Sequence, residues 1–138
     1  MSLLEIIGES ANPGPIGRIS RKREPDSPKN KNLLFHFLIA VTSLFIVEYT
    51  YLDTNKGTQM NIDFWIFNGI LLAYLLIGYY ITIIPNTSNL GWVPFVIDNP
   101  FRFSDDINRF SILMMLLLMP GKYVLGSLIN YYRHLKTK

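Results

Sequence analysis

The sequence predicts an all-α integral membrane protein: a transmembrane helical hairpin with an extended N-terminal tail and a kinked amphipathic or re-entrant C-terminal helix. Two long, almost wholly apolar runs carry this prediction, Leu33–Leu52 and Phe64–Ile84. A helix rises about 1.5 Å per residue, so about 20 apolar residues match the roughly 30 Å of bilayer hydrocarbon. Only eleven residues, Asp53–Asp63, separate the two runs, which favours two spans joined by a short loop.

Composition supports the same class of protein. The chain has 138 residues, 49% of them hydrophobic, and the long runs leave little material for a separate soluble core, which needs roughly 50 residues or more. The absence of cysteine excludes disulfides, thiolate metal sites and cysteine nucleophiles. A net charge of +3 does not indicate a nucleic-acid partner. We therefore expect three regions: a basic tail over 1–32, the hairpin over 33–84, and interfacial segments over 85–138.

The tail is rich in glycine and proline, which favours an extended chain with at most one apolar-faced turn, Ser2–Ile7, before Gly8. Basic residues flank the expected spans, and we expect them to contact anionic lipid headgroups, with a specific partner site as the alternative. They are Arg18, Arg21, Lys22, Arg23, Lys29 and Lys31 before the first span, and Lys122 and Arg133 near the C-terminus.

Charge also predicts orientation. A hairpin places both tails on one side of the membrane, and that side then holds twelve of the thirteen lysines and arginines, since the loop between the spans contains only Lys56. The positive-inside rule assigns this side to the cytoplasm, or to the matrix or stroma of an organelle. Both termini are therefore expected there.

The segment after Pro85 is predicted to be irregular, with the amphiphilic stretch Trp92–Ile97 at the membrane interface. Ser104-Asp105-Asp106 is a helix start signal, because carboxylates favour the positive end of a helix. We expect a helix to begin near Ser104.

The last helix is ambiguous in the sequence. The stretch Phe110–Tyr132 is long enough to span, but Pro120-Gly121-Lys122 lies in its middle, and a lysine at the centre of a span costs about 2.5 to 3.5 kcal/mol. We expect a kinked, interfacial or re-entrant pair of short helices, with a third span as the alternative. A polar stripe at helical spacing favours the surface position; its members are Lys122, Gly126, Asn130, Arg133 and Thr137.

Polar residues within the runs are candidate functional residues. Glu48 and Asn68 lie at similar depth on the two expected spans, about 6 Å from the hairpin end, and we expect an intramembrane polar clasp between them. An ion or proton relay and a Glu48 side chain that reaches the headgroups are the alternatives. Gly69, Ala73 and Gly78 supply small side chains to the second span, which indicates a helix-packing face.

The sequence contains no strong catalytic, metal or nucleotide motif. Neither a glycine-rich phosphate loop nor a nucleophile elbow is present, and helix capping explains the aspartates beside Arg102 and Arg109. His36 could ligate a haem or pigment, but the only other histidine, His134, lies in the C-terminal tail, so an interfacial hydrogen bond is favoured. We expect no catalytic residue, metal or cofactor.

Two functional classes remain. The first is a non-catalytic accessory or assembly subunit that packs against a larger membrane complex, as in energy-converting membranes, and contacts lipids. The second is a small homo-oligomeric pore or membrane effector. The first is preferred because the second span carries no polar stripe to line a water-filled lumen, and because the tail has no core of its own.

Overall fold

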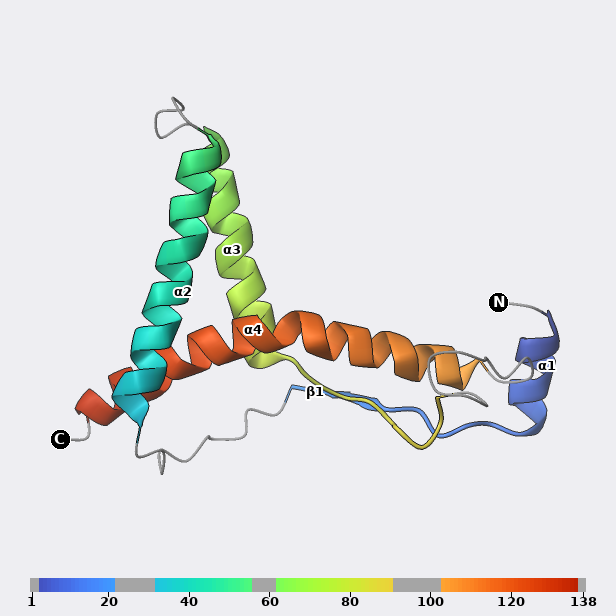
Figure 1. Ribbon diagram of the computed structural model, residues 1–138. Coiled ribbons are helices and arrows are strands. Elements are labelled where there is room, and N and C mark those ends of the chain that lie inside the picture. Colours follow the sequence, from blue (N-terminus) through green and yellow to red (C-terminus); the bar gives the residue numbers. More distant parts are fainter. Residues whose placement is uncertain (1–2, 22–31, 56–61, 91–102, 137–138) are drawn as a thin grey trace. The chain divides into compact units, whose positions relative to one another are not determined.

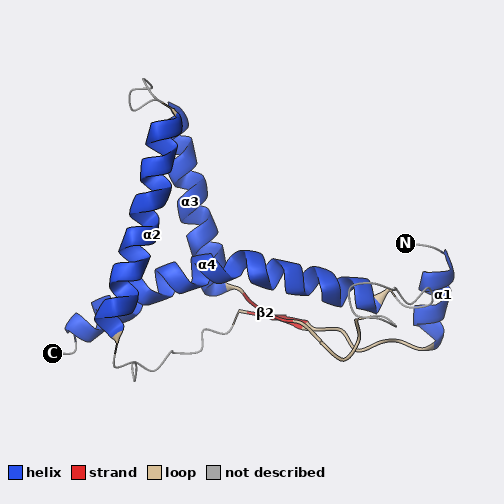
Figure 2. Ribbon diagram, viewed as in Figure 1, coloured by secondary structure: helices blue, strands red, loops and turns tan. Residues whose placement is uncertain are grey.

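The computed structural model describes residues 3–21, 32–55, 62–90 and 103–136. Over these residues the chain forms four helices and two short strands (Figures 1 and 2). Three of the helices, α2, α3 and α4, are long and apolar enough to cross a membrane, in agreement with the predicted class. In chain order the elements are α1 (Leu3–Ala11), β1 (Arg18–Ser20), α2 (Leu33–Thr54), α3 (Ile62–Tyr80), β2 (Thr82–Ile84) and α4 (Ser104–Lys136).

The chain divides into two compact units. The ribbon unit consists of Met1–Lys22 and Ile81–Leu117, and the hairpin unit of Arg23–Tyr80 and Leu118–Lys138. α4 therefore contributes its first half to the ribbon unit and its second half to the hairpin unit.

In the hairpin unit, α2, α3 and the second half of α4 share one small hydrophobic core, and this half of α4 runs across the ends of α2 and α3 that lie away from their loop (Figure 1). Its buried core takes one residue from each helix, Ala40, Leu75 and Val124. Partly buried apolar side chains surround these three; they are Leu44, Leu71, Tyr74, Leu125 and Leu128. The helix predicted over the first apolar run is confirmed, since α2 begins at Leu33 and continues to Thr54.

Two glycines bring α3 and α4 into close contact. A Cβ atom on Gly78 would lie 2.9 Å from the backbone oxygen of Leu118 and 2.9 Å from the backbone nitrogen of Lys122, so no side chain fits there. A Cβ atom on Gly121 would lie 3.1 Å from the Tyr74 ring. Small residues let the two helix backbones approach closely and gain van der Waals contact. Such contact matters in a membrane, where the hydrophobic effect does not drive helices together.

The expected pair of short helices is wrong, because α4 is one helix of 33 residues with Pro120 inside it. Proline lacks an N–H, and its ring crowds the carbonyl of the preceding turn. The Tyr74 hydroxyl lies 3.2 Å from the backbone nitrogen of Gly121 and accepts its hydrogen bond. A side chain of α3 thus supplies a partner at the point where the proline disturbs the helix.

The ribbon unit corrects two further expectations. The second apolar run is not helical to Ile84: α3 ends at Tyr80, and Thr82–Ile84 pairs antiparallel with Arg18–Ser20, Arg18 opposite Ile84. The tail is not wholly extended, since it contains the nine-residue helix α1, whereas β1 is extended. α3 still measures about 28 Å at 1.5 Å per residue, which matches a bilayer core.

Candidate functional site

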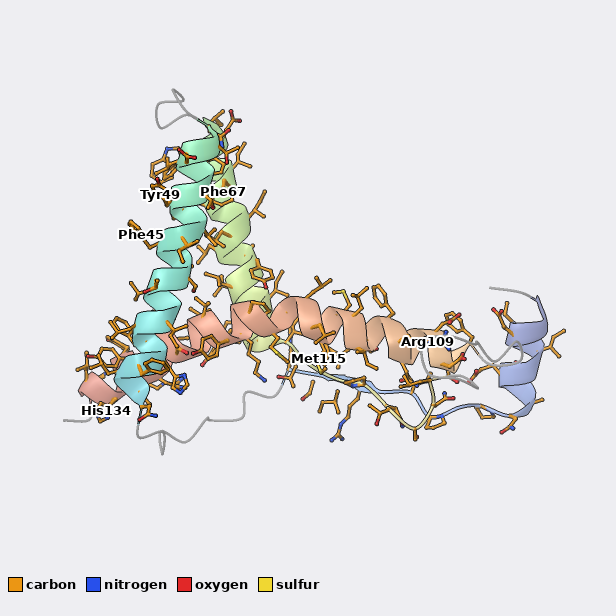
Figure 3. All side chains as sticks on the ribbon, in the orientation of Figure 1. Phe45, Tyr49, Phe67, Arg109, Met115 and His134 are labelled. Carbon is orange, nitrogen blue, oxygen red and sulfur yellow. The ribbon has the colours of Figure 1, made fainter. Side chains whose placement is uncertain are left out.

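Among the described residues, the fully or almost fully buried polar side chains all belong to the ribbon unit. Ser104, Asp105 and Asn108 at the start of α4 are fully buried, and Asn89 in the preceding loop is 7% exposed. Arg109, labelled in Figure 3, follows them on α4. We call the side chains of Glu9, Asn89, Ser104 and Asn108 the polar clamp.

Asn108 is the centre of the polar clamp. Its Oδ1 accepts hydrogen bonds from the backbone nitrogens of Gly17, at 2.8 Å, and Asn86, at 3.4 Å. Its Nδ2 donates to the backbone oxygens of Pro15 and Asn89, both at 2.9 Å. One buried amide therefore uses donor and acceptor to bind two segments that lie far apart in the sequence.

Glu9 caps α4 from the other end of the chain. Its Oε2 accepts from the backbone nitrogen of Ser104 at 3.0 Å, and its Oε1 accepts from that of Gly14 at 2.8 Å. The hydrogen bond from the Ser104 N–H lowers the pKa of the Glu9 carboxyl below its ordinary value of 4.5. A carboxylate at the first turn also interacts favourably with the helix dipole. Ser104 uses its own Oγ to accept from Asn89 Nδ2 at 2.8 Å.

Two further contacts complete this region. Arg109 donates from Nε and Nη2 to the backbone oxygen of Leu90, at 2.9 and 2.6 Å. Gly17 is required by close packing, because a Cβ atom there would lie 2.5 Å from the backbone oxygen of Ile84. Among the described residues, no buried side-chain nitrogen or oxygen lacks a hydrogen-bond partner. The polar clamp therefore fastens three segments together, 9–17, 86–90 and 104–109.

The predicted clasp between Glu48 and Asn68 is not formed in this structure. Asn68 Nδ2 donates to the backbone oxygen of Phe64 within its own helix, at 3.1 Å, and no hydrogen bond of the described residues joins it to Glu48. Both side chains are half-buried. Asn68 pairs with its own helix because an amide four residues after a carbonyl reaches it without ordering a second helix.

The predicted packing face separates into two parts. Gly78 is buried and contacts α4, whereas Gly69 has no atom within 4 Å of a Cβ built on it, and Ala73 is exposed. Gly78 thus serves the chain's own packing. Gly69 and Ala73 belong to a surface that the described residues leave uncovered.

The residues predicted to contact headgroups are only partly described. Arg18 and Arg21 in the ribbon unit are exposed, as is Lys122 on α4, and Arg133 is half-buried. Lys22, Arg23, Lys29 and Lys31 lie outside the described residues, as do the loop at Lys56 and the stretch Trp92–Ile97. Headgroup binding stays a prediction.

His36 lies on α2, where its Nδ1 is 2.8 Å from the Tyr123 hydroxyl, with the two rings edge to face. This contact accounts for one of its ring nitrogens. No group of three or more metal-ligating side chains occurs in the part of the chain that the structure describes.

Sequence reasoning missed the polar clamp because its contacts join residues up to 95 positions apart. The sequence did contain one signal of it. Three polar residues open α4, and a fourth, Asn108, follows one turn into a helix that is otherwise mostly apolar. Comparison with protein-family models, curated proteins and solved structures finds no match to this chain.

Proposed function

We propose that this chain is a small, non-catalytic integral membrane subunit that packs against a larger membrane complex as an accessory or assembly factor. An energy-converting membrane, in which small subunits of this kind are common, is the setting that we favour. The observation that carries the proposal is the outward face of α3.

α3 has two distinct faces. At about 100° per residue, its buried and half-buried side chains fall on one side, and its exposed ones fall within an arc of about 180° on the other. The middle of the exposed arc holds Gly69 and Ala73, flanked by the large apolar residues Ile62, Leu76 and Tyr80, which are 73%, 40% and 52% exposed. The exposed face is thus apolar with a shallow centre.

A shallow centre favours a helix as the neighbour of this face. Lipid chains cover large and small side chains alike, whereas small residues let two helix backbones approach and gain van der Waals contact. α2 shows the contrasting pattern: Phe45 and Tyr49 project from it on the side away from α3, 68% and 60% exposed (Figure 3). Bulky outward rings of this kind are suited to lipid.

The test is to fill the shallow face with large side chains. Gly69→Leu with Ala73→Leu adds volume at a glycine that has open space around it and at an exposed alanine, so insertion and the hairpin unit should be unchanged. Co-purification with the native complex in mild detergent should be lost. Val41→Leu on the exposed side of α2 is the matched control and should co-purify normally.

Undiminished co-purification of the double variant would contradict the use of this face. A ring of identical chains that loses its assembly in the double variant would instead support the homo-oligomeric pore.

We also propose that both termini lie on the cytoplasmic, matrix or stromal side. The charge distribution supports this orientation, because the residues joining α2 to α3 contain a single basic residue. α4 is then an interfacial helix, and its exposed Lys122 supports such a position.

A further inference from the structure

α1 is docked by its polar side and presents its apolar side outward. Glu5 and Glu9 are half-buried, whereas Ile6 and Ile7 are 52% and 64% exposed. A surface helix of a soluble domain shows the reverse arrangement, with its apolar stripe against the core.

The polar clamp fixes this orientation. Glu9 accepts hydrogen bonds from the backbone nitrogens of Ser104 and Gly14, and rotating α1 to bury its isoleucines would break both. The chain therefore holds an apolar helix face open to its surroundings.

Exposed apolar side chains also occur at the β1 strand of the β1–β2 ribbon, and there basic side chains lie beside them. Ile16 and Ile19 are 51% and 73% exposed, and Arg18 and Arg21 are exposed beside them. Within the described part of the chain, neither of these arginines is paired with a carboxylate.

The geometry points to α1 and the β1–β2 ribbon as a binding surface for anionic lipid, with the isoleucines in the headgroup and acyl boundary and the arginines on lipid phosphates. Exposed apolar side chains with arginines beside them match an anionic bilayer surface in both polarity and charge.

The position of β2 in the sequence, directly after α3, favours a bilayer over a protein as the binding partner of this surface. A single residue, Ile81, separates the last residue of α3 from β2. Two residues of extended chain reach about 7 Å, so where α3 crosses a bilayer the ribbon begins near the headgroups. This inference depends on membrane insertion alone and does not require a partner complex.

The experiment places one nitroxide label at a time on the full chain, in nanodiscs of phosphatidylcholine with one quarter phosphatidylglycerol. The absence of cysteine makes Ile6→Cys, Ile7→Cys and Thr87→Cys simple to label, and Thr87, an exposed polar loop residue, is the water reference. Collision with oxygen reports lipid, and collision with a polar nickel chelate reports water.

Labels at positions 6 and 7 should favour oxygen, and the label at 87 should favour nickel. Arg18→Gln and Arg21→Gln should each lower the ratio of inserted to free α1 about fivefold, since a basic residue near an anionic surface contributes on the order of that factor. Pure phosphatidylcholine nanodiscs remove the contribution of both arginines together and should lower the ratio about 25-fold.

Two results would overturn the inference. Nickel accessibility at 6 and 7 equal to that at 87 would place α1 in water. Poor access of both reagents would show that protein covers the face. Neither result affects the Gly69 and Ala73 experiment, so the two proposals fail separately.

Discussion

Asn108→Ala tests whether the polar clamp holds the N-terminal segment. The substitution removes four hydrogen bonds, two accepted and two donated, from a fully buried side chain. Each is worth about 1 kcal/mol net, and a partner left unsatisfied costs more. Because Pro15 is exposed and Gly17 and Asn86 are half-buried, water replaces part of the loss. We expect docking of the segment to weaken by about 2 to 4 kcal/mol.

Hydrogen exchange measures this directly, because the Gly17 N–H is itself donated to Asn108 Oδ1. A loss of 2 to 4 kcal/mol corresponds to exchange about 30- to 700-fold faster across residues 14–20, up to the limit of full exposure.

Ser111→Ala is the control for this prediction. The Ser111 hydroxyl lies one turn further along α4 and donates at 2.7 Å to Ile107 O within the helix, so its loss should leave exchange at 14–20 unchanged. If Asn108→Ala exchanges as slowly as Ser111→Ala, the polar clamp does not hold the segment.

Three further predictions address acid sensitivity, α4 and topology. Because the pKa of Glu9 is lowered, its contribution to stability is complete above pH 4.5, its ordinary pKa, and is lost as the pH falls through the lowered pKa. Hydrogen exchange of residues 9–17, corrected for the intrinsic rate, should therefore accelerate in that acid range. Glu9→Gln should remove this pH dependence. Tyr74→Phe removes the acceptor for the N–H that follows Pro120 and should lower the thermal stability of the purified protein by roughly 0.6 to 1.7 kcal/mol, whereas an unchanged melting temperature would show that the hydroxyl does not support α4. Impermeant maleimide should label Ser20→Cys and Lys136→Cys from the same side, while labelling from opposite sides would make α4 a third span.

Local signals predicted the elements that depend on local physics. α2 begins at Leu33 because an apolar run of this length is stable as a helix in lipid. α4 begins at Ser104, where a serine and two aspartates suit the unpaired N–H groups of a first turn.

The errors occurred where distant residues decide the conformation. Thr82–Ile84 looks like more of the second span because its residues are apolar or β-branched, but strand pairing with Arg18–Ser20 ends the helix earlier. Pro120 looks like a break, yet a hydroxyl of α3 accepts the next N–H and the helix continues. Gly8 did not prevent α1, which reaches Ala11 before Pro13.

The candidate sites also divide into features set by local residues and features set by distant residues. Small residues on the second span were visible in the sequence, but only the contacts of Gly78 with Leu118 and Lys122 distinguish it from the open Gly69. The polar clamp was visible only as a run of polar residues at the start of α4, because the backbone groups that Asn108 binds come from segments far away in the sequence.

The mass and composition of the native particle in mild detergent decide whether this chain is an accessory subunit of a larger membrane complex. We expect a hetero-complex in which this 15.9 kDa chain is one of several different subunits. A lone chain, or a ring made only of copies of it, would show that the chain is not such a subunit.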